Sequence, residues 1–123
     1  MLEAYSINAD VGAETPIPLN NVSLKKGCTA TLTGTSTIEL NKCGVYMVSF
    51  DGVAGTSTTV LMYKDGVEQP QAQSTGTTLG FKTLVQVPNN NGKCPCASGT
   101  TLQFLNLTAA TFDNANVVVT KLI

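Results

Sequence analysis

The sequence predicts an all-β fold, a sandwich or jelly roll of about eight to ten short antiparallel strands. Three observations predict it. Glycine and threonine are common, while charged residues make up only 12% of the 123 residues. No window has a sustained 3.6-residue apolar period with helix caps. Short apolar or alternating segments instead recur at near-regular spacing, with turn residues between them.

The composition limits the function. A hydrophobic fraction of 42% argues against disorder, and the length predicts one domain spanning residues 1–123. The formal net charge is −1, and the sequence contains neither histidine nor arginine. Histidine is the commonest general base and metal ligand, and arginine is the usual residue that binds phosphate and guanine. We therefore expect no enzyme activity, no cofactor and no nucleic-acid partner.

No apolar run reaches the roughly 18 residues of a membrane span, so we expect no membrane partner. The N-terminal segment MLEAYSINAD lacks a basic region followed by an apolar one, so we expect no signal peptide.

The first half of the chain contains an edge segment and a hairpin. Pro16 and Pro18 flank Ile17 and forbid a central strand there, because proline cannot donate to a ladder. Gly34 lies in the turn of the hairpin. The expected elements are strand 4–10, edge segment 16–24 with apolar contacts Ile17, Leu19, Val22 and Leu24, hairpin arms 28–32 and 37–40, and strand 44–52.

Strand 44–52, GVYMVSFDG, is central. β-Branched and aromatic residues dominate it, and a glycine lies at either end, which favours a strand over a helix. Its apolar side chains fall on both faces of an extended chain, so it must be covered on both sides.

The second half contains further strands separated by polar loops. Asp65-Gly66 is the clearest hairpin turn, because glycine tolerates positive φ. Pro70 weakens the strand that follows. The expected strands are 58–64, 67–73, 81–87, 101–107 and 116–123, and the expected loops are 53–58, 74–80 and 88–100.

Three strands are apolar on both faces: 45–50, 81–87 and 117–119. The hairpin at 28–40, by contrast, alternates cleanly and places threonine outside. One sheet is thus expected to be buried on both faces and the other on one. The simplest explanation is an oligomer packed through the first sheet. The alternative is that a few apolar side chains are merely tolerated on the surface.

The order of these motifs resembles a TNF-like jelly roll, the fold of complement-type globular heads, and most of all its bacterial and phage branch. The resemblance covers nearly the whole chain, with cysteine at position 43 where that branch has proline. It rests on Ile17-Pro18, Asn20-Asn21-Val22, Gly44, Tyr46, Val48 and Phe50, the Asp65-Gly66 turn, Val87-Pro88, the strand from Thr101, and Lys121-Leu122.

The resemblance implies a homotrimer, with one sheet of each subunit around a threefold axis. It places Tyr46, Val48, Phe50, Phe81 and Phe104 in the core. It places Tyr5, Val45, Met47, Leu84 and Val118 at the trimer interface.

The resemblance further implies a structural protein similar to head decoration or head-fibre proteins of tailed phages. Such a protein is made in the host cytoplasm and displayed on the virion, with the major capsid protein as partner. Two alternatives stay open: a trimeric head that binds host-surface glycans or proteins, and a spore- or cell-surface domain of a collagen-like protein.

The four cysteines leave more than one interpretation open. Cys28 and Cys43 lie about equally far from the hairpin turn, so they are a candidate disulfide, whereas a reducing cytosol favours free thiols. Cys94 and Cys96 lie in the long loop, where a zinc site would need two further ligands. The candidate ligand or partner loop consists of Asn89, Asn90, Asn91, Cys94 and Cys96. Asp51, Asp65 and Asp113 are expected in turns, where backbone hydrogen bonds explain them better than calcium does.

Overall fold

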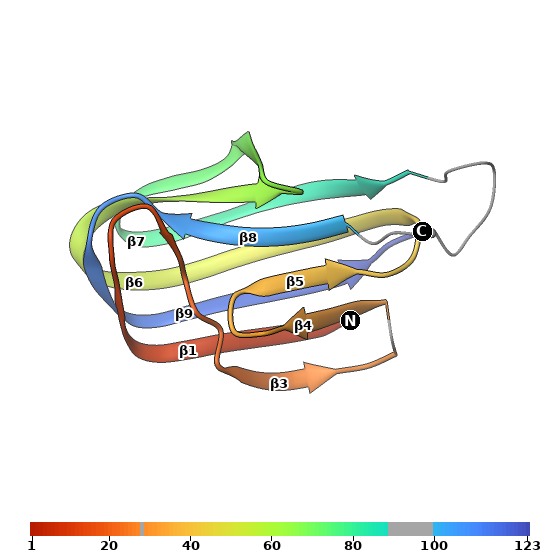
Figure 1. Ribbon diagram of the computed structural model, residues 1–123, viewed down its shortest axis with the longest axis horizontal. Helices are drawn as coiled ribbons and strands as arrows, with labels where there is room; N and C mark the ends of the chain where they lie inside the picture. Colours follow the sequence, from red (N-terminus) through yellow and green to blue (C-terminus); the bar gives the residue numbers. More distant parts are fainter. Residues whose placement is uncertain (28, 89–99) are drawn as a thin grey trace.

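The structure is a computed structural model that describes residues 1–27, 29–88 and 100–123, and these residues form nine strands and no helix. Within those ranges, therefore, no helix is long and apolar enough to cross a membrane. The strands are β1 (Leu2–Val11), β2 (Thr15–Pro16), β3 (Asn21–Lys25), β4 (Ala30–Thr33), β5 (Thr37–Leu40), β6 (Gly44–Lys64), β7 (Val67–Val87), β8 (Thr100–Asn106) and β9 (Ala110–Lys121) (Figure 1).

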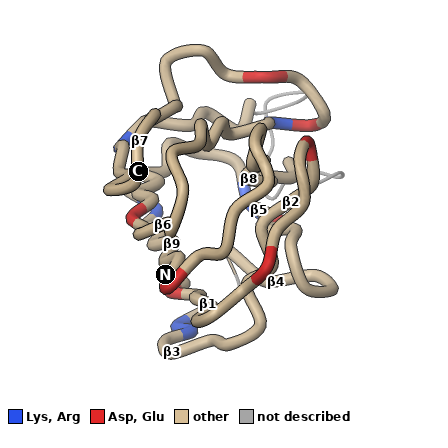
Figure 2. Tube along the Cα trace, turned by 90° about the vertical axis from the view of Figure 1, so that its left-hand side faces the viewer, with Lys and Arg blue, Asp and Glu red and all other residues tan. Residues whose placement is uncertain are grey.

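The strands follow one hydrogen-bonded path, β3-β1-β9-β6-β8-β5-β4, with β7 against β6 and β2 against β8. β6 belongs to both layers, since its residues 46–54 pair with β9 and its residues 60–64 with β8. The end-on view shows this path folding over into two layers (Figure 2).

We call the two layers sheet I and sheet II. Sheet I consists of β3, β1, β9, residues 44–54 of β6 and residues 78–87 of β7. Sheet II consists of β4, β5, β8, β2, residues 58–64 of β6 and residues 67–76 of β7. The three strands that the sequence marks as apolar on both faces are neighbours in sheet I. The all-β sandwich predicted from the sequence is confirmed.

β6 and β7 are longer than predicted. The expected loops at 53–58 and 74–80 are wrong, because both segments are strand. They form the crossing between the sheets, where the β6–β7 ladder shifts register between Val53 and Thr58 and resumes at Thr58 opposite Gly76. Just beyond it, the hydroxyl groups of Thr59 and Thr75 lie 2.8 Å apart. Gly52 does not end the strand; a Cβ there would lie 3.1 Å from the Asn114 carbonyl oxygen. This glycine permits close packing of β6 on β9.

The core lies between the two sheets. Tyr46, Val48 and Phe50 are fully buried, Phe104 is buried, and Phe81 is half-buried beside them. The rings of Phe50 and Phe104 stack with centroids 5.5 Å apart, and the Phe81 ring stacks on Phe50 at the same distance. Burying each such aromatic side chain contributes about 1.5–3 kcal/mol, so this cluster ties the two sheets together.

The proline segment carries the chain from sheet II to sheet I. Ile17 and Leu19 are fully buried there, and the Ile17 amide donates to the Phe104 carbonyl at 2.7 Å. The expectation that Val22 and Leu24 make apolar contacts of the same kind is wrong. Both are exposed, because β3 pairs only with β1 and lies at the edge of sheet I.

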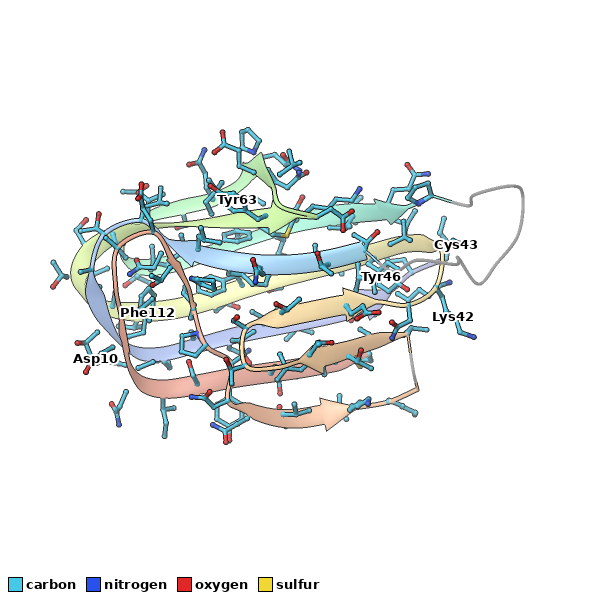
Figure 3. The ribbon with its side chains drawn as sticks, viewed as in Figure 1. Asp10, Lys42, Cys43, Tyr46, Tyr63 and Phe112 are labelled. Carbon is cyan, nitrogen blue, oxygen red and sulfur yellow. The ribbon has the colours of Figure 1, made fainter. Side chains whose placement is uncertain are left out.

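The hairpin of β4 and β5 pairs as expected, with Ala30 opposite Leu40. Beyond it, the chain turns into β6 at Cys43. The hydroxyl of the buried Tyr46 donates to the Lys42 carbonyl at 2.7 Å, which fixes this turn against the core (Figure 3).

Candidate functional site

The face of sheet I that points away from the core carries exposed and half-buried apolar side chains. Along β6, residues 46, 48, 50 and 52 point inward and are buried, and the intervening residues point outward. Cross-strand partners share a face, so the ladders extend this assignment to β1, β7 and β9. We call this surface the open face; on β1, β6, β7 and β9 its apolar members are Tyr5, Ile7, Val45, Met47, Val53, Leu84 and Val118.

All five side chains expected at the trimer interface lie on the open face. Met47 is 38% exposed and lies opposite Leu84, which is 61% exposed. Val45, Tyr5 and Val118 are half-buried. The structure thus brings these five residues to one surface; their role as an interface stays a prediction.

Two apolar members, Ile7 and Val53, were not among the predicted interface residues. Both lie opposite Asn114 of β9, and Ile7 is 61% exposed. The alternation of Tyr5 and Ile7 is a signal that could have found Ile7. Val53 was missed because β6 was expected to end at Gly52.

One hollow lies on the open face. Met47, Lys82, Thr83 and Leu84 line a hollow of about 260 Å³. A second hollow of about 390 Å³ lies where the C-terminal residues meet the start of β6. Its lining is Cys43, Gly44, Val45, Gln86, Val87, Lys121 and Ile123.

The outward face of sheet II has a different character. Hydroxyl, amide and carboxylate side chains predominate across β4, β5 and β8, and several bond to one another. Gln103 Nε2 donates to Thr37 Oγ1 at 2.9 Å, and Asn41 Nδ2 donates to Thr31 Oγ1 at 3.3 Å. These three strands present an outward surface that is suited to water, whereas the open face of sheet I is not.

The acidic residues are placed differently from the prediction. Asp65 does lie in the turn between β6 and β7, where its Oδ1 accepts from the Thr101 amide at 2.8 Å. Asp51 and Asp113 lie within β6 and β9, so their expected turns are wrong. No group of three or more His, Cys, Asp or Glu side chains that could hold a metal occurs within the described ranges.

Cys43 is disulfide-bonded, so the free-thiol interpretation is wrong for this residue. Cys28 lies outside the described residues, and its pairing with Cys43 stays a prediction. Also outside the described residues is the candidate ligand loop of Asn89, Asn90, Asn91, Cys94 and Cys96.

Solved structures of the same architecture share little sequence with this chain. The globular domain of zebrafish complement 1qA protein is similar with a TM-score of 0.75 at 7% identity, covering 99% of this chain and 96% of that one. Murine APRIL is similar with a TM-score of 0.65 at 10% identity, covering 98% of each chain. Rabbit GITRL is similar with a TM-score of 0.64 at 8% identity, covering 100% of this chain and 95% of that one.

The fold is therefore a TNF-like jelly roll, as the sequence motifs indicated. No protein-family model matches the sequence, and no curated protein does either.

Proposed function

We propose that this protein is a non-enzymatic structural protein that works as a homotrimer packed through the open face of sheet I. One observation carries the proposal. In β6, one set of alternate side chains fills the core, while Val45, Met47 and Val53 of the other set point outward from the same sheet. A second copy of the chain is the occupant that would remove these side chains from water without any further component.

The size of the open face supports this occupant. Sheet I has five strands, and its open face extends along residues 45–53 of β6. At about 4.8 Å between strands and about 3.3 Å per residue, it measures roughly 24 Å by 30 Å, or about 700 Å². A standard stable interface buries about 800 Å² on each partner.

We propose further that the trimer is displayed on the head of a bacteriophage as a decoration or head-fibre protein. The support is the motif resemblance to the phage branch, above all Ile17-Pro18, Asn20-Asn21-Val22 and the strand from Gly44. Its partner would then be the major capsid protein, and its place of synthesis the host cytoplasm. The test is incubation of purified trimer with undecorated capsids and with a glycan array. Saturable binding to capsids is expected, and binding to glycans alone would contradict it.

Met47 and Val48 give a matched pair of variants for the trimer itself. Met47→Asp places a carboxylate on the open face, and Val48→Asp places one in the core. Burying an unpaired charge costs several kcal/mol in either place. Met47→Asp should therefore lower the mass from trimer to monomer with β circular dichroism retained, whereas Val48→Asp should abolish the β spectrum.

Sedimentation equilibrium and circular dichroism on both variants decide the outcome. A Met47→Asp protein that remains trimeric would show that the subunits do not meet through this face. A folded but dissociated Val48→Asp protein would show that the two faces of β6 are assigned the wrong way round.

A further inference from the structure

The open face carries four charged side chains among its otherwise apolar and neutral polar residues: Glu3, Asp10, Asp51 and Lys82. Asp10 is compensated within the subunit, because its Oδ1 accepts from Thr111 Oγ1 at 2.6 Å. Glu3 is compensated within the subunit. Its Oε1 accepts from Ser23 Oγ at 2.5 Å, and its Oε2 accepts from Asn116 Nδ2 at 3.4 Å. Sheet I thus has its own partners for this carboxylate.

Asp51 and Lys82 are not compensated in the same way. Both are exposed, and neither side chain makes a hydrogen bond or an ion pair with any residue that the structure describes. Asp51 lies opposite Gly80, whose missing side chain leaves room for its carboxylate: a Cβ there would lie 3.0 Å from Asp51 Oδ1. Lys82 lies opposite Ser49. Each subunit therefore presents one unpaired carboxylate and one unpaired ammonium group on the same face.

Covering the open face would bury both charges, and an unpaired buried charge is strongly destabilising. In a closed ring of identical subunits, every contact joins the same two patches, one from each neighbour. One carboxylate and one ammonium per subunit then suffice for an ion pair at every contact. A covered face is also the setting in which such pairs have measurable coupling, unlike solvent-exposed pairs.

We propose, resting on the proposed trimer, that Asp51 of each subunit pairs with Lys82 of its neighbour and fixes the register in which the open faces meet. The occupant of this site is a second copy of the chain. The pair acts as a specificity device, because a slipped or inverted contact would bury both charges away from their partners on the neighbouring subunit.

Charge reversal tests the pairing. Asp51→Lys and Lys82→Asp should each dissociate the trimer, and the variant with both substitutions should restore it. Glu68→Lys is the matched control, because Glu68 is an exposed carboxylate of β7 outside sheet I, and it should leave the mass unchanged. The neutral variants Asp51→Asn and Lys82→Gln avoid like-charge repulsion and should still raise the dissociation constant about tenfold or more.

Mixing the two single variants distinguishes a pair between subunits from a pair within one. The two positions are diagonal cross-strand neighbours, about 7–8 Å apart between Cα atoms, which a lysine can span. If the pair joins subunits, Asp51→Lys and Lys82→Asp proteins should form mixed trimers, in which two of the three contacts carry an ion pair, at lower concentration than either protein assembles alone. If only the double variant assembles and mixing has no effect, the pair lies within one subunit and the proposal is wrong.

The failure of this proposal is distinct from the failure of the trimer. A monomeric unsubstituted protein would overturn the proposed trimer and the pair together. An unsubstituted trimer whose mass and dissociation constant survive both reversals and both neutral variants would retain the trimer and overturn the pair alone.

Discussion

Asn106 is a polar side chain that joins three strands, β1, β6 and β8, at one end of the sandwich, and its replacement has a calculable cost. It is fully buried on β8. Its Nδ2 donates to the carbonyl oxygens of Val11 at 3.1 Å and Gly12 at 3.3 Å, and its Oδ1 accepts from Thr58 Oγ1. One amide group therefore holds the end of β1 and the middle of β6 against β8.

Asn106→Leu keeps the side-chain size and removes these three hydrogen bonds. Two of the groups left behind retain other partners. Thr58 Oγ1 lies 3.0 Å from the Thr108 carbonyl oxygen, and the Gly12 carbonyl accepts from Thr15 Oγ1 at 2.8 Å. At about 1 kcal/mol net for each lost bond, the free energy of unfolding should fall by about 3 kcal/mol.

Asn106→Asp adds a dependence on pH that Asn106→Leu lacks. A carboxylate at this position would face the Val11 and Gly12 carbonyl oxygens without a proton to donate. Burial would raise the pKa of the new carboxyl group above its unfolded value of about 3.9. Because the folded pKa is the higher one, the variant is least destabilised below the unfolded pKa. It loses stability as the pH rises from the unfolded pKa to the folded pKa.

Urea unfolding followed by circular dichroism, at one fixed subunit concentration, measures both effects. Asn20→Leu is the control, because Asn20 is exposed, and its cost should stay within about 0.5 kcal/mol. An Asn106→Leu protein as stable as the unsubstituted one would refute the argument. So would an Asn106→Asp protein equally destabilised at about pH 4 and pH 7.

Three further substitutions test local features of the fold. Ser6→Ala should raise the free energy of unfolding by about 1 kcal/mol, because Ser6 Oγ is buried without a hydrogen-bond partner among the described residues; a clear loss of stability in the same urea assay would show that the hydroxyl has a partner after all. Gly44→Ala should cost about 3 kcal/mol, because Gly44 has a φ of 143° and a Cβ there would overlap the Ile123 carbonyl oxygen. Gly66→Ala, at a φ of 80° with open space around it, should cost only about 1–2 kcal/mol, and equal costs for the two glycines would remove the steric part of the argument.

The two faces of sheet I could be anticipated because a strand has a strict period of two. Val45 and Met47 on one side of the chain and Tyr46 and Val48 on the other are a pattern that only a strand covered on both faces requires. The same period, with the family resemblance, led to Leu84 and Val118. Local sequence was enough here because each prediction needed only the alternation within one strand.

The unpredicted features depend on contacts between distant parts of the chain. Gly52, Gly55 and Gly76 look like turn residues, yet they lie within β6 and β7, because the two strands cross between the sheets together, with a register shift in their ladder between Val53 and Thr58. The buried polar contacts of Asn106 join residues about 50 and 95 positions away in sequence. No local pattern distinguishes such an asparagine from one in a turn.

The solution mass of the unsubstituted protein tests the central claim most directly. Sedimentation equilibrium at micromolar concentration should give three times the monomer mass of 12.8 kDa. The trimer should persist on dilution until the concentration falls below its dissociation constant. A single species at the monomer mass throughout that range would contradict the claim that a second copy of the chain covers the open face of sheet I.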